Sequence, residues 1–430
     1  MTLSRRTLLP LAAVLLAGTS LASASAAELV IESWRNDDLP IWQEKIIPAF
    51  EAKHPDIKVK FQPTAPKEYD AALRAKLDGG TAGDLITCRP FDASLQLFQN
   101  GKLEALNGME ELKDFPDFAI AAWSTDDGKS TFCMPMASVM HGFMYNKDIF
   151  EELGLQVPTT EAEFFAVLDK IKENGSYIPM AMGTVDQWEA ATMGYTNIGP
   201  NYWKGEEGRK ALVEGKAKLT DPAYVQPFEE IAKWKPYLGD GFEAQTYPDS
   251  QNLFTLGRAA IYPTGSWEIS PFGKDAGFEM GAFKPPLPEG ADQCYISDHV
   301  DIALGMNAAT PNADAAKTFL SWLLQPENYG RFLNMEPGLF LPVTETGSAA
   351  ESFWNDPLVV KYHDQVESMI ANSQTGMLFG FTGGRTFPSI ASISAQNILA
   401  QVLQAVVVDG TAPADAVAQG QQMMLDAVGS

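Results

Sequence analysis

The sequence predicts an α/β protein with two lobes, and three observations support this fold class. Strand and helix signals alternate from Leu29 onward, a pattern that favours a parallel sheet with helices on both faces. The chain has 430 residues, more than one hydrophobic core usually supports. A second series of such signals begins near Ser138, and a late strand at Asp301–Met306 would return to the first sheet. We therefore expect lobes joined by strands that cross between them more than once.

The first lobe is expected to begin with a βαβαβ unit. Asp38 followed by Pro40 has the pattern of a helix start, and Gly79 with Gly80 would end a second helix at Lys67–Leu77. Apolar and β-branched runs predict the strands of this unit at Leu29–Trp34, Ile57–Gln62 and Asp84–Cys88.

The second lobe is expected to be richer in helices. Thr160 and Glu163 form a capping-box pattern that would open a helix ending near Asn174. The Pro- and Gly-rich segment Lys284–Gly290 is typical of a connection. Other predicted helices are Pro222–Lys235, Pro248–Leu256, Pro388–Val408 and Pro413–Val428, the last two separated by Asp409 and Gly410.

The segment around residue 260 carries the strongest functional signal in the chain. A helical turn would end at Gly257 in the left-handed conformation, and a buried strand would follow at Ala259–Tyr262. Pro263 would stop this strand, and Gly265 would bend the chain beyond it.

Trp267 and Glu268 would then lie beyond the carboxyl end of this strand. In open α/β sheets, ligands bind in the crevice at this edge. A tryptophan offers a flat apolar face, and a glutamate accepts hydrogen bonds from hydroxyl groups, a combination that suits a sugar. The alternative is a structural tryptophan packed beneath a loop.

Three sequence blocks occur in a characteristic order. Phe143–Phe150, followed by Gly154–Thr160, contains Tyr-Asn-Lys-Asp and then Gly-Leu and Pro-x-Thr. Phe254–Glu268 has a helix, Gly-Arg-Ala-Ala, a strand and Gly-x-Trp, and Ile302–Asn312 leads into the helix that contains Ala315–Leu320. From about residue 29 to the C-terminus, this order resembles the family 1 extracellular solute-binding proteins, sugar-binding subunits of bacterial ABC importers of the maltodextrin-binding type.

The resemblance implies the fold of a type II periplasmic binding protein, with two α/β lobes joined by crossing hinge strands and the ligand cleft between them. The N-terminal lobe would comprise residues 27–137 and 295–330, and the C-terminal lobe residues 138–294 and 331–430. Closure of the lobes would capture a mono- or oligosaccharide and present it to a membrane permease. The resemblance does not name the sugar.

First-lobe candidates follow two of the strands. Trp34 would be a stacking surface, and Asp38 would accept hydroxyls, unless the first belongs to the core and the second only caps a helix. The family has acidic, basic and aromatic contacts in the loop after the third strand, which favours Arg89 and Asp92. A surface ion pair is the alternative there.

The resemblance adds candidates in the second lobe and at the crossings. It implies an acidic and an aromatic contact at Asp186 and Trp188. His141, where the chain enters the second lobe, would donate to a hydroxyl or be a satisfied interior histidine. Asp298 and His299 stand at the return crossing, where the family usually has a Gly-rich turn.

Arg385 is the last candidate. It follows Gly383 and Gly384 in a region where the family often has an aromatic contact, which Phe379 or Phe387 would then supply. An arginine here points to an acidic or sulfonated sugar.

Residues 1–26 have the features of a cleaved signal peptide. Arg5 and Arg6 precede an apolar stretch too short to span a bilayer, and Ala24-Ser25-Ala26 offers a cleavage site. The twin arginines allow export by the Sec or the Tat route. Thr19 stands where a lipoprotein has its lipidated cysteine, so we expect a periplasmic protein without a lipid anchor.

The chain is strongly acidic. It has 55 Asp and Glu against 31 Lys and Arg, and the signal peptide contains two of the basic residues and none of the acidic ones. The formal net charge therefore changes from −24 to about −26 in the mature chain. Nucleic acid is excluded as a partner, because phosphate binding needs clustered Lys and Arg. We expect a well-solvated monomer.

The cysteines and histidines give no sign of a metal or cofactor site. Cys88, Cys133 and Cys294 form no CxxC pair; an oxidising compartment permits one disulfide in three pairings, but buried free thiols are favoured. The four histidines, at positions 54, 141, 299 and 363, are scattered. No metal and no cofactor is expected.

Reversible sugar binding without covalent chemistry is the favoured function. A secreted carbohydrate-active enzyme is one alternative, because carboxylates are plentiful, although no catalytic pair stands out. The chain has no GxSxG or HExxH motif, and Asp127–Ser130 lacks the upstream glycine of a P-loop. The same fold with a non-sugar solute is the other alternative.

Overall fold

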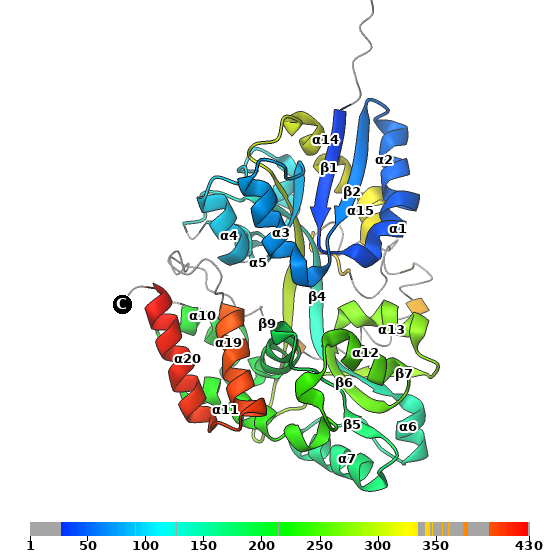
Figure 1. Cartoon of the computed structure of the whole chain (residues 1–430), viewed down its shortest axis with the longest axis vertical. Helices are drawn as coiled ribbons and strands as arrows, with labels where there is room; N and C mark the ends of the chain where they lie inside the picture. Colours follow the sequence, from blue (N-terminus) through cyan, green and yellow to red (C-terminus); the bar gives the residue numbers. More distant parts are fainter. Residues whose placement is uncertain are drawn as a thin grey trace, which may run out of the picture.

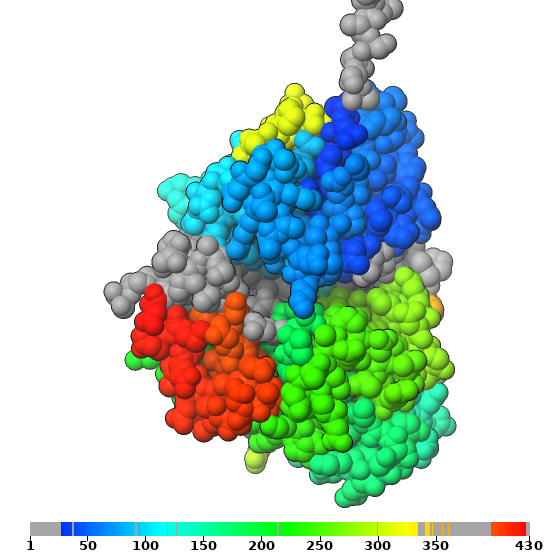
Figure 2. All heavy atoms as spheres, viewed as in Figure 1, coloured from blue at the N-terminus to red at the C-terminus, as the bar shows by residue number. Residues whose placement is uncertain are grey.

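The computed structural model describes residues 27–333 except 91, 126 and 214, and also 340–344, 346, 355, 360–361, 373–376 and 395–428. Figure 1 shows two lobes stacked along the long axis of the molecule. The upper, first lobe contains the N-terminal segments and α14 (Ala313–Leu323); the lower, second lobe contains the green segments and the orange and red helices within residues 395–428. Figure 2 shows the same division at the molecular surface. The predicted architecture of two α/β lobes is confirmed.

The first-lobe sheet contains the three predicted strands. β1 (Ala27–Ser33) lies between β2 (Ile57–Pro63) and β3 (Leu85–Cys88) and is parallel to both. α3 (Pro66–Asp78) connects β2 to β3, as predicted. β3 then pairs antiparallel with β8 (Cys294–Met306), because β8 enters from the second lobe in the opposite direction. The sheet is therefore mixed, and the prediction of a parallel sheet holds only for its first three strands.

Short helical elements complete the first lobe. Besides α3 and α14 they are η1 (Asn36–Asp38), α1 (Leu39–Ile41), η2 (Trp42–Ile46), α2 (Ile47–Lys53), α4 (Asp92–Gln99), η3 (Glu110–Asp114), α5 (Asp117–Ala121) and α15 (Pro326–Leu333).

The second lobe surrounds the strands β5 (Ile178–Met180), β6 (Ala259–Gly265) and β7 (Met280–Phe283). The predicted capping box is confirmed: the side chains of Thr160 and Glu163 each accept from the other's backbone N–H. The helical elements are α6 (Lys147–Glu152), α7 (Glu161–Asn174), α8 (Gln187–Glu189), η4 (Ala190–Thr196), α9 (Pro200–Trp203), α10 (Glu206–Val213), α11 (Pro222–Ala232), η5 (Lys235–Tyr237), η6 (Phe242–Ala244), α12 (Tyr247–Thr255), η7 (Ser266–Glu268), α13 (Ile269–Asp275), α19 (Ala395–Leu403), η8 (Gln404–Val408) and α20 (Pro413–Val428).

Among the described residues, two strands cross between the lobes, and the segment 340–344 lies beside them. β4 (Cys133–Asn146) pairs with β8 as far as Met140 and with β6 from His141 onward, so one strand belongs to both lobes. β8 returns beside it and begins earlier than predicted, and β9 (Ser373–Gly376) pairs with its first residues. In the segment 340–344, Leu341 exchanges backbone hydrogen bonds of 3.0 and 3.1 Å with Ser138 of β4. Repeated crossing is thereby confirmed.

Each lobe has its own hydrophobic core. One cluster contains residues from 29 to 139 and from 300 to 343, and two others contain residues from 140 to 296, residue 341 and residues from 398 to 424. Phe332 and Phe340 pack in the first cluster, whereas Leu341 packs in the second lobe. Trp267 contacts the cores of both lobes.

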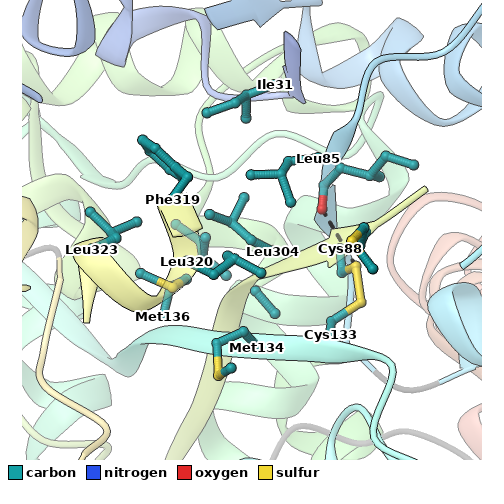
Figure 3. Close-up of a cluster of buried hydrophobic side chains, with 14 of the residues drawn as sticks. Ile31, Leu85, Cys88, Cys133, Met134, Met136, Leu304, Phe319, Leu320 and Leu323 are labelled. Atoms are coloured by element: carbon teal, nitrogen blue, oxygen red, sulfur yellow. Dashed lines mark hydrogen bonds between the residues drawn. A yellow bond between two sulfur atoms is a disulfide. The ribbon is translucent and has the colours of Figure 1, made fainter. Parts of the chain in front are cut away.

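A disulfide connects two strands in the core of the first lobe. Cys88 at the end of β3 is bonded to Cys133 at the start of β4 (Figure 3), and Cys294 is a buried thiol. The expectation of three free thiols is therefore wrong. The two half-cystines meet beside Gly305 of β8, where a β carbon would lie 2.7 Å and 2.8 Å from their sulfur atoms. The sequence does not reveal this meeting, because it depends on the pairing of β8 with both strands.

Around β6, one local prediction is confirmed and one is corrected. Gly257 has the predicted left-handed backbone, with φ of 68°. Pro263 does not stop the strand, which continues to Gly265. β5 pairs with β6 only as far as Ile261, so the proline lies where the strand has one partner, and proline is tolerated at such edges. Among the described residues, no helix has the length and apolar character needed to cross a membrane.

Candidate functional site

Trp267 and Glu268 lie beyond the carboxyl end of β6, as predicted, in the short helix η7. The indole ring folds back over Gly265, where a β carbon would be 2.0 Å from Cζ3 of the ring and 2.4 Å from the carbonyl oxygen of Met140. The His141 ring meets the indole edge-on, with centroids 5.1 Å apart. The half-buried Trp267 therefore lies against the crossing strand β4, between the two lobes.

Tyr247, at the start of α12, connects the four candidates of the second lobe. Its hydroxyl accepts from Nε1 of Trp267 at 3.0 Å and donates to the carboxylate of Glu268. Its ring meets Trp188 edge-on at 4.5 Å, and its backbone N–H donates to Asp186 at 2.8 Å. The structure thus brings these residues together around a tyrosine that sequence reasoning missed.

One sequence signal could have located this tyrosine. Thr246 and Asp249 form a capping box, with the Asp249 carboxylate accepting from the Thr246 backbone at 3.0 Å. The pattern Thr-Tyr-Pro-Asp therefore marks Tyr247 as the first residue of a helix. That this helix start faces η7 follows only from the tertiary structure.

Glu268 is inside the lobe rather than on an open wall. Only 1% of the residue is exposed, and its carboxylate accepts from Tyr247 and from Nε2 of Gln251 at 2.7 Å. Its contacts with neighbouring side chains make it part of the support for Trp267. Direct contact of Glu268 with a ligand remains a prediction.

Glu189 is a buried acid behind this cluster. One carboxylate oxygen accepts from the Gly183 N–H at 2.8 Å and from the Ser250 hydroxyl at 2.5 Å; the other has no hydrogen-bond partner among the described residues. Burial raises the pKa of Glu189 to about 7, although the two hydrogen bonds lower it. The single proton of the Ser250 hydroxyl is shared between Glu189 and the carbonyl oxygen of Tyr247, which is 2.9 Å away, so the acid is linked to the start of α12.

In the first lobe, Arg89 covers the ring of Trp34. Its guanidinium carbon lies 4.3 Å from the ring centroid, and Nε donates to Asp70 at 3.1 Å. Trp34 is 6% exposed and meets the ring of Tyr69 edge-on at 5.6 Å. A sugar could therefore reach this face of Trp34 only after Arg89 has moved, whereas Arg89 itself is one-third exposed.

Asp38 lies in a small pocket next to these residues. It forms a bidentate ion pair with Arg35, at 2.8 and 2.9 Å, and does not cap α1 through its side chain. The Arg35 guanidinium lies over the ring of Phe340, 5.5 Å from its centroid. The pocket is lined by Ser33, Arg35, Asp38, Trp42, Phe61, Thr87, Ile302, Leu304, Phe332 and Phe340.

The other candidates lie at the crossings or outside the described part of the chain. His141 is fully buried, and its Nδ1 is 3.1 Å from the carbonyl oxygen of Thr192. Asp298 and His299 of β8 pair with Met140 and Val139 of β4.

The side chains of two candidates lie outside the described part of the structure. Asp92 begins α4, and its side chain is not among the described ones. Arg385, with Phe379 and Phe387, lies outside the described residues. In the part of the chain that is described, no three His, Cys, Asp or Glu side chains gather as they would around a metal ion.

Residues 45–361, well over half of the chain, match the family described as bacterial extracellular solute-binding proteins. The chain belongs to this family. This solute-binding protein is 23% identical over 328 residues to the multiple sugar-binding protein of Streptococcus mutans, covering 73% of this chain and 76% of that relative.

Solved structures share the fold of this solute-binding protein. A chitin oligosaccharide binding protein has a TM-score of 0.73 at 20% identity, covering 93% of this chain and 98% of that one. The binding protein RafE in complex with raffinose has a TM-score of 0.72 at 20% identity, covering 93% and 99%. Likenesses at this identity show the two-lobed fold and not the ligand.

Proposed function

We propose that this solute-binding protein captures a mono- or oligosaccharide between its lobes and delivers it to the permease of an ABC importer. The observation that carries the proposal is the group of half-buried aromatic rings, Trp188, Tyr247 and Trp267, beside the crossing strands. Such rings can stack on the C–H faces of a sugar. The sugars named for the relatives support the same class of ligand.

The first lobe would supply polar contacts from the other side of the cleft. Arg89 and Asp92 follow β3, and Arg35 and Asp38 follow β1, at the carboxyl ends of neighbouring parallel strands. Hydrogen bonds to charged partners contribute about 1.5–3 kcal/mol each, so a few of them together with stacking give useful affinity. Closure would bring these polar groups toward the aromatic rings of the second lobe.

The proposal includes the domain boundaries, the cellular location and the oligomeric state. The hydrophobic clusters support lobes of 27–137 with 295–330 and of 138–294 with the C-terminal part. Phe332, Phe340 and Val343 pack with the first lobe, and Thr346 donates to Asp114 there, so we draw the last boundary after residue 346 instead of after residue 330. The mature protein would be a periplasmic monomer, exported with cleavage after residue 26 and without a lipid anchor.

A sugar panel tests this function. Purified mature protein is heated with raffinose, chitobiose, maltotriose, glucose and galactose, and each sugar is then recovered and analysed by mass spectrometry. A bound sugar at about 100 times its Kd stabilises the protein by about 2.7 kcal/mol, which raises Tm by several degrees. Recovery of the unchanged sugar supports binding. Cleavage of a sugar would favour a carbohydrate-active enzyme. A non-sugar solute found bound in native mass spectrometry would favour the same fold with a non-sugar ligand.

A further inference from the structure

We propose that Tyr247 positions the indole of Trp267 in the sugar site and that Glu268 acts through Tyr247 by holding its hydroxyl. The proposal rests on the proposed function where it concerns ligand affinity. It assigns Glu268 a supporting role instead of contact with the ligand. Two features of the structure carry it: the anchoring of Tyr247 itself, and the way in which its hydroxyl completes the restraint on Trp267.

Tyr247 is fixed on both sides of its backbone. Its N–H donates to Asp186 at 2.8 Å, and its carbonyl oxygen accepts from Ser250 at 2.9 Å. The preceding residue, Thr246, caps α12 together with Asp249. The phenol ring is in turn held edge-on against Trp188. A side chain with so many restraints can serve as a fixed reference for its neighbours.

The hydroxyl of Tyr247 interacts with one group that can only accept a hydrogen bond and with another that can only donate one. The Glu268 carboxylate can only accept when ionised, and the indole Nε1 can only donate. Donation to Glu268 therefore leaves a lone pair of the hydroxyl directed to Nε1 of Trp267, at 3.0 Å. The chain from Glu268 through Tyr247 to Trp267 has one consistent direction, and Gln251 adds a second donor to the same carboxylate oxygen.

The hydrogen bond to Tyr247 adds a fixed direction to the packing of Trp267. Gly265 lies beneath the ring and His141 meets it edge-on, so both restrain the plane of the indole through packing. Packing contacts of this kind do not by themselves fix the direction in which Nε1–H points, because they are not directional. The bond from Nε1 to Tyr247 supplies that direction. A stacking surface for a sugar gains affinity when it is fixed before binding.

The test compares Tyr247→Phe with Tyr237→Phe in the full mature protein. Tyr237 is a matched control, because it is a half-buried tyrosine of the same lobe whose hydroxyl also donates to a carboxylate, that of Asp169 at 2.7 Å. Acrylamide quenching of tryptophan fluorescence is measured without ligand, and each substitution is repeated in a Trp267→Phe background. We expect Tyr247→Phe to change the quenching, Tyr237→Phe to leave it unchanged, and the change to vanish when Trp267 is absent.

Affinity gives the second readout, with raffinose and chitobiose as probes in isothermal titration. Tyr247→Phe should weaken binding about three- to tenfold, the equivalent of one hydrogen bond, and should have no further effect in the Trp267→Phe background. Glu268→Gln should weaken binding by less than Tyr247→Phe, because the amide oxygen still accepts from Tyr247.

The outcomes separate this proposal from the proposed function. Unchanged quenching in Tyr247→Phe, or the same change with and without Trp267, overturns the positioning role. If neither sugar binds the wild-type protein but the quenching change depends on Trp267, the indole is positioned as proposed and the sugar function fails for these probes. A purely structural role would lower the free energy of unfolding without any coupling between the two residues in affinity.

Discussion

The indole of Trp267 lies directly on Gly265, where a β carbon would be 2.0 Å from the ring. The backbone of Gly265 is extended, with φ of −146° and ψ of −173°, so any residue could adopt its conformation. Glycine is required for space and not for a bend, which corrects the expectation from sequence. The spacing Gly-x-Trp therefore reflects a ring that folds back onto the chain two residues earlier.

Gly265→Ala should displace this ring. The new methyl group would meet both Trp267 and the carbonyl of Met140, and overpacking of this kind costs about 1–3 kcal/mol of stability. Urea unfolding measures the cost, and a change in the tryptophan emission spectrum reports the displacement. Gly277→Ala is the control, because a β carbon there would meet nothing within 4 Å. Equal stability and equal spectra for both variants would contradict the arrangement.

Trp267→Ala should weaken sugar binding by about tenfold or more, because it removes a stacking face together with its burial. Isothermal titration with the sugar selected in the panel measures the loss. The exposed Leu256→Ala serves as a control in the same lobe. An affinity that stays within about twofold of the wild-type value would remove Trp267 from the site.

Glu189→Gln should change how stability depends on pH. Burial raises the pKa of Glu189 from 4.5 to about 7, so the folded protein holds this proton more tightly than the unfolded chain does. The contribution of Glu189 to the free energy of unfolding of the wild type should then fall by about 3 kcal/mol as pH rises from 4.5 to 7, and this contribution should be absent from the variant.

Urea unfolding between pH 4.5 and 8 measures the difference between the two profiles. Burial also raises the pKa of Glu161 to about 7, but that carboxyl is present in both proteins, so its contribution cancels in the difference. Parallel profiles would show that Glu189 does not titrate in this range in the folded protein.

Reduction of the disulfide should destabilise the first lobe. Cys88 and Cys133 are 45 residues apart, and opening a loop of that length costs about 2–4 kcal/mol. Unfolding with and without dithiothreitol measures this cost. A Cys294→Ala variant should respond to the reductant as the wild type does, and the double Cys88→Ala, Cys133→Ala variant should not respond. No effect of reductant on the wild type would refute the bridge.

Much of the fold follows from local signals in the sequence. The capping box of Thr160 and Glu163, the left-handed Gly257 and the three strands of the βαβαβ unit depend on residues close together in the chain. Local physics fixes such features, since a cap or a positive φ needs only its neighbours. The position of Trp267 beyond β6 was predictable for the same reason.

The sequence by itself determined which residues stand at the carboxyl ends of β1, β3 and β6, and the order of blocks from which membership of the solute-binding family was predicted. Only the tertiary structure decided which of them meet. Tyr247 reaches Trp267 from 20 residues away, and Cys88 bonds to Cys133 because β8 pairs with the strands of both. Arg89 covers Trp34 only once β1 and β3 lie side by side. Each of these contacts depends on strand pairing and helix placement across the whole chain, which no local pattern of residues encodes.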